Sequence, residues 1–173
     1  MQKAEESFRR YVGDRLVGLT RVAYLLTGDV HQADDLVQAT LERVASRWER
    51  IERHGDPDPY VRRVLYSQHV SAWRRHRGRD VPVAEPPEPP GSRSGSDDHS
   101  GRVVLSVAVA QALSRLSRRQ RAVLVLRYFE DQTEARTAEI LGLSVGTVKS
   151  YARAALARLR EVAPELATAG EGS

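Results

Sequence analysis

A run of residues near the end of the chain, LGLSVGTVKSYARAALARLR (residues 141–160), carries hydroxyl, ammonium and guanidinium groups but no acid. Its apolar residues recur every three or four positions, which predicts a helix with one face against a core. The opposite face then presents groups that bind phosphates and the edges of DNA bases in the major groove. Six residues are candidate DNA contacts on this basis: Ser144, Thr147, Lys149, Ser150, Tyr151 and Arg153.

The elements around this segment form a predicted helix-turn-helix. A short helix, capped by Thr133 or Asp131, precedes Gly142, which suits a tight turn. Ser144 can then cap the second helix. The alternative is a helical hairpin whose polar face is only solvated. A solvated face normally mixes charges of both signs, so the lack of acids in residues 141–160 favours DNA binding.

The rest of the chain also has helical periodicity, and no stretch alternates apolar and polar residues as a strand would. We therefore expect an all-α fold of two small helical domains. In the first half, Gly28 separates two helices, and Asp29 can cap the second with Gln32 as its capping-box partner. The segment at residues 51–60 is expected to be a loop before a third helix, which reaches about Arg77.

In the second half, Ser117 and Gln120 form another predicted capping box. The helix that follows is expected to bury four side chains: Val123, Leu124, Leu126 and Tyr128.

The clearest boundary is the segment at residues 78–101, where five prolines precede a stretch rich in Gly, Ser and Asp. Proline interrupts helices, and this segment has too little apolar surface to pack. The predicted organisation is a domain at residues 1–77, a flexible, disordered linker at 78–101, a helix-turn-helix domain at 102–163 and a tail at 164–173.

The composition argues against catalysis. The chain has no cysteine, its five histidines are scattered, and no clustered side chains supply a nucleophile or general base. We expect no catalytic residue, no metal and no cofactor. No apolar run approaches the roughly 20 residues of a membrane helix, so we expect no membrane insertion and a cytoplasmic protein.

Segments on both sides of the linker resemble bacterial RNA polymerase sigma factors. YLLTGDVHQADDLVQATLERVASRWERI (residues 24–51) and YVRRVLYSQHVSAWRR (residues 60–75) are similar to their domain that binds core polymerase and melts the promoter. LSRRQRAVLVLRYFEDQTEARTAEILGLSVGTVKSYARAALARLRE (residues 116–161) is similar to their second DNA-binding domain. This two-domain layout, over about residues 5–162, resembles the extracytoplasmic-function (ECF) type.

The resemblance implies a polymerase-binding motif on Asp34, Asp35 and Gln38. In the family this helix docks on the coiled coil of the β′ clamp. The spacings of three and four residues put these side chains on one helix face, where acids can pair with arginines of a partner. The structural alternative is that acids near a helix N-terminus are favoured by the helix dipole alone.

The resemblance also implies recognition and melting of the −10 element by the third helix and the loop before it. Cations there would hold phosphates, while aromatic or polar groups would hold an extruded base. The candidates are Tyr60, Arg62, Arg63, Trp73, Arg74, Arg75 and Arg77. For Tyr60 and Trp73 a place in the core is an equal alternative, and the arginines could form a solvated face.

The implied partners are core RNA polymerase, through its β′ clamp and β subunit, promoter DNA, and an anti-sigma factor. The helix-turn-helix would read the −35 element. The chain departs from the family pattern at Ser67, Ser71, Arg136 and Thr137, so its promoter sequence does not follow. Two other classes fit the same pattern: a stand-alone helix-turn-helix regulator, which would bind a palindromic operator without polymerase, and a helical adaptor that binds no DNA.

Overall fold

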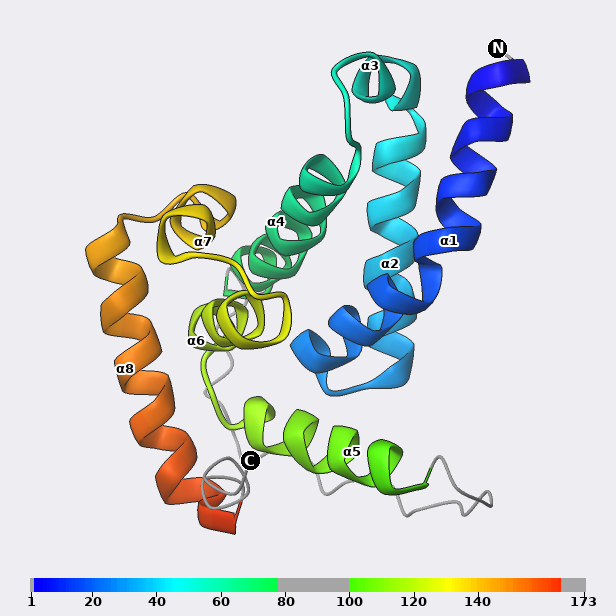
Figure 1. Ribbon diagram of the computed structural model, residues 1–173. Helices are drawn as coiled ribbons and strands as arrows, with labels where there is room; N and C mark the ends of the chain where they lie inside the picture. Colours follow the sequence, from blue (N-terminus) through cyan, green and yellow to red (C-terminus); the bar gives the residue numbers. More distant parts are fainter. Residues whose placement is uncertain (1, 78–99, 166–173) are drawn as a thin grey trace.

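The computed structural model describes residues 2–77 and 100–165, and in this part every regular element is a helix (Figure 1). The side chains of residues 72–77 and 100–106 lie outside the description, as do residues 78–99 of the predicted linker and residues 166–173 of the tail. The expected all-α class is confirmed. The elements are α1 (Gln2–Thr27), α2 (Val30–Ala45), α3 (Trp48–Arg53), α4 (Asp58–Arg77), α5 (Ser100–Ser114), α6 (Arg118–Leu124), the π-helix η1 (Val125–Phe129), α7 (Glu134–Leu141) and α8 (Val145–Val162).

The N-terminal lobe, α1 to α4, begins with two antiparallel helices joined by the predicted break. Gly28 has a φ of 72°, a left-handed conformation that favours glycine, and it ends α1. The Asp29 side chain accepts a hydrogen bond from the Gln32 backbone N–H at 2.8 Å, which confirms it as the cap of α2. The predicted capping box is incomplete, because the Asp29 backbone N–H donates to Thr27 Oγ1 at 3.4 Å rather than to the Gln32 side chain. The four side chains that α2 buries, Ala33, Val37, Thr40 and Val44, recur at spacings of three and four residues along one face of the helix.

The loop expected from residue 51 was placed too early, because the chain first forms the short helix α3. Apolar burial explains this helix. Trp48 is 4% exposed and Ile51 is 8% exposed. The Trp48 ring lies 5.1 Å from the Phe8 ring and 4.9 Å from the Tyr11 ring, centroid to centroid. Its indole N–H donates to Ser7 Oγ at 2.7 Å, so the packing of Trp48 on α1 fixes α3.

The C-terminal lobe, α5 to α8, contains the second predicted capping box. Ser117 and Gln120 each bond the other's backbone N–H at the start of α6. The prediction that Tyr128 is buried is wrong, since Tyr128 is 59% exposed. The α-helix changes to the π-helix η1 after Leu124, and a π turn places one additional residue in the turn. The side chains after this point are rotated relative to α-helical periodicity, and Tyr128 turns outward.

The two lobes share one apolar core. Leu26 of α1 and Tyr66 of α4 are fully buried in the same cluster as Val125 and Leu126 of η1. Figure 1 shows α4 between α2 on one side and α6 and α7 on the other, in agreement with its contacts. Arg121 of α6 is 9% exposed and also bridges the lobes.

The Arg121 guanidinium donates to main-chain carbonyls only. Within its own lobe it bonds Leu113 O at 2.9 Å, and Ser114 O and Leu116 O at 3.3 Å. From the other lobe it bonds Leu26 O near the end of α1. Burial, with a smaller contribution from nearby Arg118, lowers the pKa of Arg121 to about 10.

Candidate nucleic-acid and protein interfaces

The predicted polymerase-binding residues lie on α2 beside an apolar groove. Asp34, Asp35 and Gln38 are all exposed. Asp34 and Gln38 line a groove of about 540 Å³ between α1 and α2, whereas Asp35 does not. Leu16 of α1 lines the same groove and is 41% exposed. The groove therefore combines acid and amide groups with open apolar surface, a combination that suits an amphipathic helix with basic residues.

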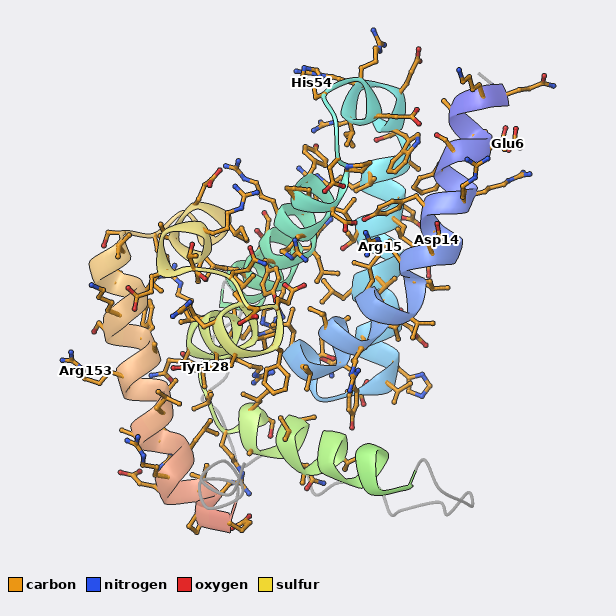
Figure 2. The ribbon with its side chains drawn as sticks, viewed as in Figure 1. Glu6, Asp14, Arg15, His54, Tyr128 and Arg153 are labelled. Carbon is orange, nitrogen blue, oxygen red and sulfur yellow. The ribbon has the colours of Figure 1, made fainter. Side chains whose placement is uncertain are left out.

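Tyr60 lies in a pocket of about 480 Å³ formed by α3, the loop after it and the first turn of α4. Arg47, Arg50 and His54 line this pocket with it. Arg47 Nη1 donates to the Tyr60 hydroxyl at 3.4 Å, and the His54 ring lies 2.7 Å from Arg50 O. His54 projects outward from the α3 end of the lobe in Figure 2. An aromatic ring with two guanidinium groups beside it can stack on an unpaired base and hold its phosphates.

The predicted arginines of α4 have different surroundings. Arg63 is exposed and lines a second pocket, of about 360 Å³, together with Arg43 and residues of the α7–α8 turn. Arg62 instead forms an ion pair with Glu130 of the other lobe, with Nε 3.0 Å from Oε1. Trp73, Arg74, Arg75 and Arg77 belong to the last turns of α4, and their side chains lie outside the described residues.

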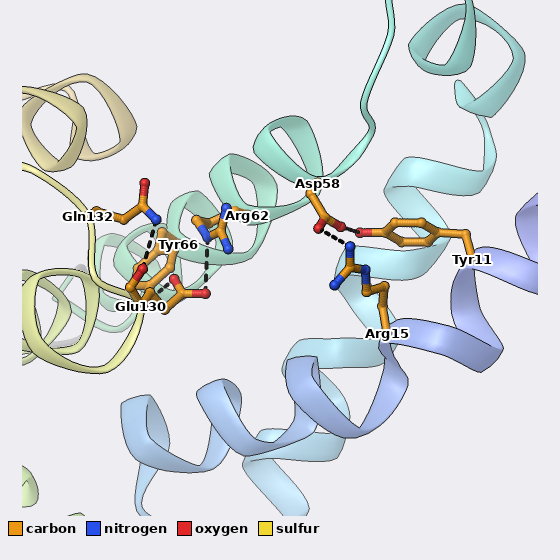
Figure 3. A network of polar contacts seen from close by, with 7 residues as sticks. All are labelled: Tyr11, Arg15, Asp58, Arg62, Tyr66, Glu130 and Gln132. Atoms are coloured by element: carbon orange, nitrogen blue, oxygen red, sulfur yellow. Dashed lines mark hydrogen bonds and ion pairs between the residues drawn. The ribbon is translucent and has the colours of Figure 1, made fainter.

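Glu130 is the centre of a small network between the lobes (Figure 3). The Tyr66 hydroxyl donates to Glu130 Oε2 at 2.8 Å, while Arg62 binds the other carboxylate oxygen. Burial, together with the Glu130 charge, raises the pKa of Tyr66 well above its ordinary value. Tyr66 therefore stays protonated and acts as a donor. The Glu130 side chain is 12% exposed, and the arginine and the phenol compensate its carboxylate.

The helix-turn-helix has the predicted geometry. Thr133 caps α7, Gly142 ends it with a φ of 65°, and Ser144 caps α8 by accepting from the Thr147 N–H at 3.1 Å. The outer arc of α8 leaves Lys149, Ser150 and Arg153 exposed.

Figure 2 shows Arg153 extending from α8 away from the other helices. Lys149 lies 3.6 Å from Glu134 of α7. Tyr151 is half-buried against Val148 and Ala138, so part of its ring belongs to the lobe's core.

Comparison with known proteins identifies the family. The chain matches the family models Sigma-70 region 2 over residues 9–79 and Sigma-70, region 4 over residues 106–159. It is 40% identical to the RNA polymerase sigma-E factor of Streptomyces coelicolor, over 89% of this chain and 84% of that one. It is 33% identical to the ECF RNA polymerase sigma factor SigL of Mycobacterium tuberculosis, over 86% and 84% of the two chains. The chain belongs to the ECF sigma factors.

Solved structures agree with this sigma factor's fold over both lobes. RpoE of Bartonella quintana, in complex with the anti-sigma factor NepR, is 26% identical with a TM-score of 0.64, over 90% of this chain and 96% of that one. CnrH, in complex with the cytosolic domain of CnrY, is 21% identical with a TM-score of 0.60, over 91% and 88%, and supports the fold alone. As a sigma factor, the protein binds core RNA polymerase and directs promoter-specific initiation of transcription.

Sequence reasoning missed some residues of this sigma factor's candidate sites. Arg43 lies in the last turn of α2 and Arg47 lies just after its end, with no spacing that relates them to Tyr60, and only the fold places them at the two pockets. Glu130 was missed because its partner Arg62 lies 68 residues earlier. In the described part of the chain, no helix has the length and apolar character needed to cross a bilayer. No three His, Asp or Glu side chains gather there as they would around a metal ion.

Proposed function

We propose that the two lobes of this sigma factor divide promoter recognition between them. Residues 1–77 bind polymerase and melt the −10 element, residues 102–163 read the −35 element, 78–101 is the linker and 164–173 is a tail. The protein has no catalytic role of its own and works in the cytoplasm, where polymerase and promoters meet.

The polymerase-binding surface is the groove beside α2. Asp34 and Gln38 provide a carboxylate and an amide at its edge, and Leu16 offers apolar contact. Such a surface fits a basic amphipathic helix of the β′ clamp coiled coil, with Asp35 pairing with an arginine just outside the groove. Because exposed acids contribute little to folding, substitution of Asp35 should reduce affinity for core polymerase without changing thermal stability.

The −10 site is the pocket beside Tyr60. A base extruded from the duplex would stack on the phenol ring, and Arg47 and Arg50 would hold the phosphates on either side. This arrangement is the observation that carries the proposal, because an aromatic ring, two guanidinium groups and an open pocket lie together in the region-2 lobe. Arg63 extends the cationic surface toward the C-terminal lobe.

The −35 reader is the outer arc of α8. The hydroxyls of Ser144 and Thr147 form a hydrogen bond of 2.8 Å at the N-terminus of α8, where backbone N–H groups favour a phosphate. Lys149, Ser150 and Arg153 then face the base edges, and the half-buried Tyr151 orients the helix against its neighbours. Two modest contacts on one promoter strengthen each other, since the second is intramolecular once the first has formed.

Run-off transcription with bacterial core polymerase tests this assignment. Wild-type protein should start transcription at a promoter from the host genome, and Tyr60→Ala should form promoter complexes that fail to melt. Arg153→Ala should weaken −35 recognition by about 1–3 kcal/mol if the guanidinium contacts a base. Arg158→Ala is the matched control, because Arg158 is exposed on the same helix and pairs with Glu161.

Three results would contradict the assignment. Core polymerase could stay inactive at every promoter while the free protein protects a palindrome. Tyr60→Ala could open the promoter normally. Arg158→Ala could be as defective as Arg153→Ala.

An anti-sigma factor is a further proposed partner. The support is the likeness to RpoE of Bartonella quintana, whose structure contains the anti-sigma factor NepR, together with the exposed groove beside α2. Co-purification of this chain with a product encoded next to its gene, and competition of that product with core polymerase, would test it. A product that binds without reducing polymerase binding would argue against an anti-sigma role.

A further inference from the structure

Tyr11 of α1 contacts the helices that form both walls of the Tyr60 pocket, although it does not line the pocket itself. Its ring lies 4.9 Å from the ring of Trp48, centroid to centroid, and Trp48 begins α3, which carries Arg50 on one wall. Its hydroxyl donates to Asp58 Oδ1 at 2.8 Å, and Asp58 begins α4 two residues before Tyr60 on the other wall. One side chain of α1 thus joins the two helices between which the pocket opens.

Asp58 is held from α1 by a second donor. Arg15, one turn after Tyr11, lies 2.7 Å from Asp58 Oδ2, so both carboxylate oxygens are bonded to the same helix (Figure 3). The helix dipole would explain an acid in the first turn of α4. It does not explain why a phenol and a guanidinium of another helix converge on that acid.

The hydrogen bond that joins the two walls directly is long. Arg47 Nη1, at the start of α3, donates to the Tyr60 hydroxyl at 3.4 Å, beyond the usual range for a strong bond. The bond from Tyr11 to Asp58 is shorter, is half-buried and has a charged acceptor, which makes it the stronger of the two. Burial, together with this bond and the Asp58 charge, raises the pKa of Tyr11, so the phenol stays protonated and remains a donor.

We propose that Tyr11 is a positioning residue for promoter melting. Through Trp48 and Asp58 it sets the distance between α3 and the start of α4, and thereby the width of the pocket that receives the extruded base. Such support matters because the groups of a recognition site must be held to within about 0.5 Å by neighbours whose own rotamers are fixed. This inference rests on the proposed −10 role of the Tyr60 pocket.

The test variant must leave the aromatic packing intact. The Phe8 ring lies 5.1 Å from the Trp48 ring and also lines the groove beside α2, so a smaller residue at Tyr11 would disturb the polymerase-binding surface as well. Tyr11→Phe keeps the ring and removes only the hydroxyl. Tyr24→Phe is the matched control, because it makes the same change at a half-buried tyrosine of α1 that lines neither the groove nor the pocket.

Promoter melting by the reconstituted holoenzyme is the readout. A host promoter carries 2-aminopurine in its −10 element, and the fluorescence of this base rises when it leaves the stack. Tyr11→Phe should slow the rise about fivefold or more, in line with the net contribution of one hydrogen bond, while affinity for core polymerase stays within about twofold of wild type. Asp58→Ala, which removes the same bond from the other side, should slow the rise at least as much, and Tyr24→Phe should match wild type.

A double variant shows whether Tyr11 acts through Tyr60. Tyr11→Phe combined with Tyr60→Ala should melt the promoter no more slowly than Tyr60→Ala alone, because changes that act on one contact are not additive. Additive defects, a Tyr11→Phe variant as fast as Tyr24→Phe, or an equal loss of polymerase affinity would overturn the positioning role while the −10 assignment stands. If Tyr60→Ala itself melts the promoter at the wild-type rate, the −10 assignment is wrong, and the positioning role is wrong with it.

Discussion

His69 should make the packing of the two lobes sensitive to mild acid. The His69 side chain is 2% exposed, and the buried Arg121 and nearby Arg118 face it from α6. Burial, together with these two cations, lowers the pKa of His69 from 6.5 to about 3. The folded state therefore keeps the ring neutral, whereas the unfolded chain takes up a proton below pH 6.5.

The sign and size of the effect follow from this difference. Between pH 6.5 and pH 3 the unfolded state binds more protons, so the free energy of unfolding falls as the pH falls. From pH 7.5 to pH 5.5 the expected loss is about 1.4 kcal/mol for one such histidine. The folded pKa lies far below this window, so the size depends almost wholly on the unfolded value.

Urea unfolding of the full chain at the two pH values measures this loss. With a denaturant slope of about 2 kcal/mol per molar, the midpoint should move down by about 0.7 M at pH 5.5. His69→Leu removes the titrating ring, and its midpoint should move much less, whatever its stability at pH 7.5. If wild type and His69→Leu lose the same stability, His69 is not the group that responds, and the reasoning is refuted.

Three further predictions concern stability, each measured by urea unfolding at pH 7.5. Arg121→Met should lower the free energy of unfolding by about 3–5 kcal/mol, because it leaves four main-chain carbonyls without a donor. Arg121→Lys should recover part of this loss. A loss below about 1 kcal/mol in Arg121→Met would contradict the bonding scheme. Thr137→Val should stabilise the fold by about 1 kcal/mol, since the Thr137 hydroxyl is buried without a partner. Thr40→Val should instead destabilise it, because the Thr40 hydroxyl donates to a carbonyl at 2.7 Å. A change in stability of the same sign in both variants would refute this distinction. Gly142→Ala should lower the free energy of unfolding by about 1 kcal/mol, because the φ of 65° at this position disfavours a side chain. Gly146→Ala, in the first turn of α8, should raise it by about 0.5–1 kcal/mol. A Gly142→Ala variant of unchanged stability would show that the turn can readjust.

Local features of the fold could be predicted from the sequence because their causes are local. The caps at Asp29, Ser117 and Ser144 each involve a side chain and a backbone N–H three residues later, and all three are present. The burial pattern of α2 follows from one helical period. The helix-turn-helix was predictable for the same reason, since Gly142 and its neighbours determine the turn without help from the rest of the chain.

The features that depend on distant residues could not be predicted. Tyr128 was misplaced because the π-helix breaks the α-helical period, and no residue type signals that change. The pairing of Arg62 with Glu130 joins residues 68 positions apart, and neither residue differs in type from a solvated one. The Tyr60 pocket was half predicted, because the loop was recognised while Arg47 reaches it only through the packing of α3.

The contacts of Arg121 have a consequence for how this protein varies over evolution. Every acceptor that its guanidinium uses is a main-chain oxygen, which every amino acid carries. The residues at positions 26, 113, 114 and 116 are therefore free, as far as this arginine is concerned, to drift in identity without breaking its bonds. Covariation among homologues should reveal the pair of Arg62 and Glu130, whose charges must change together. It should leave no trace of Arg121 and its partners, so a deeply buried junction can persist through lineages as a single invariant arginine with no correlated position elsewhere.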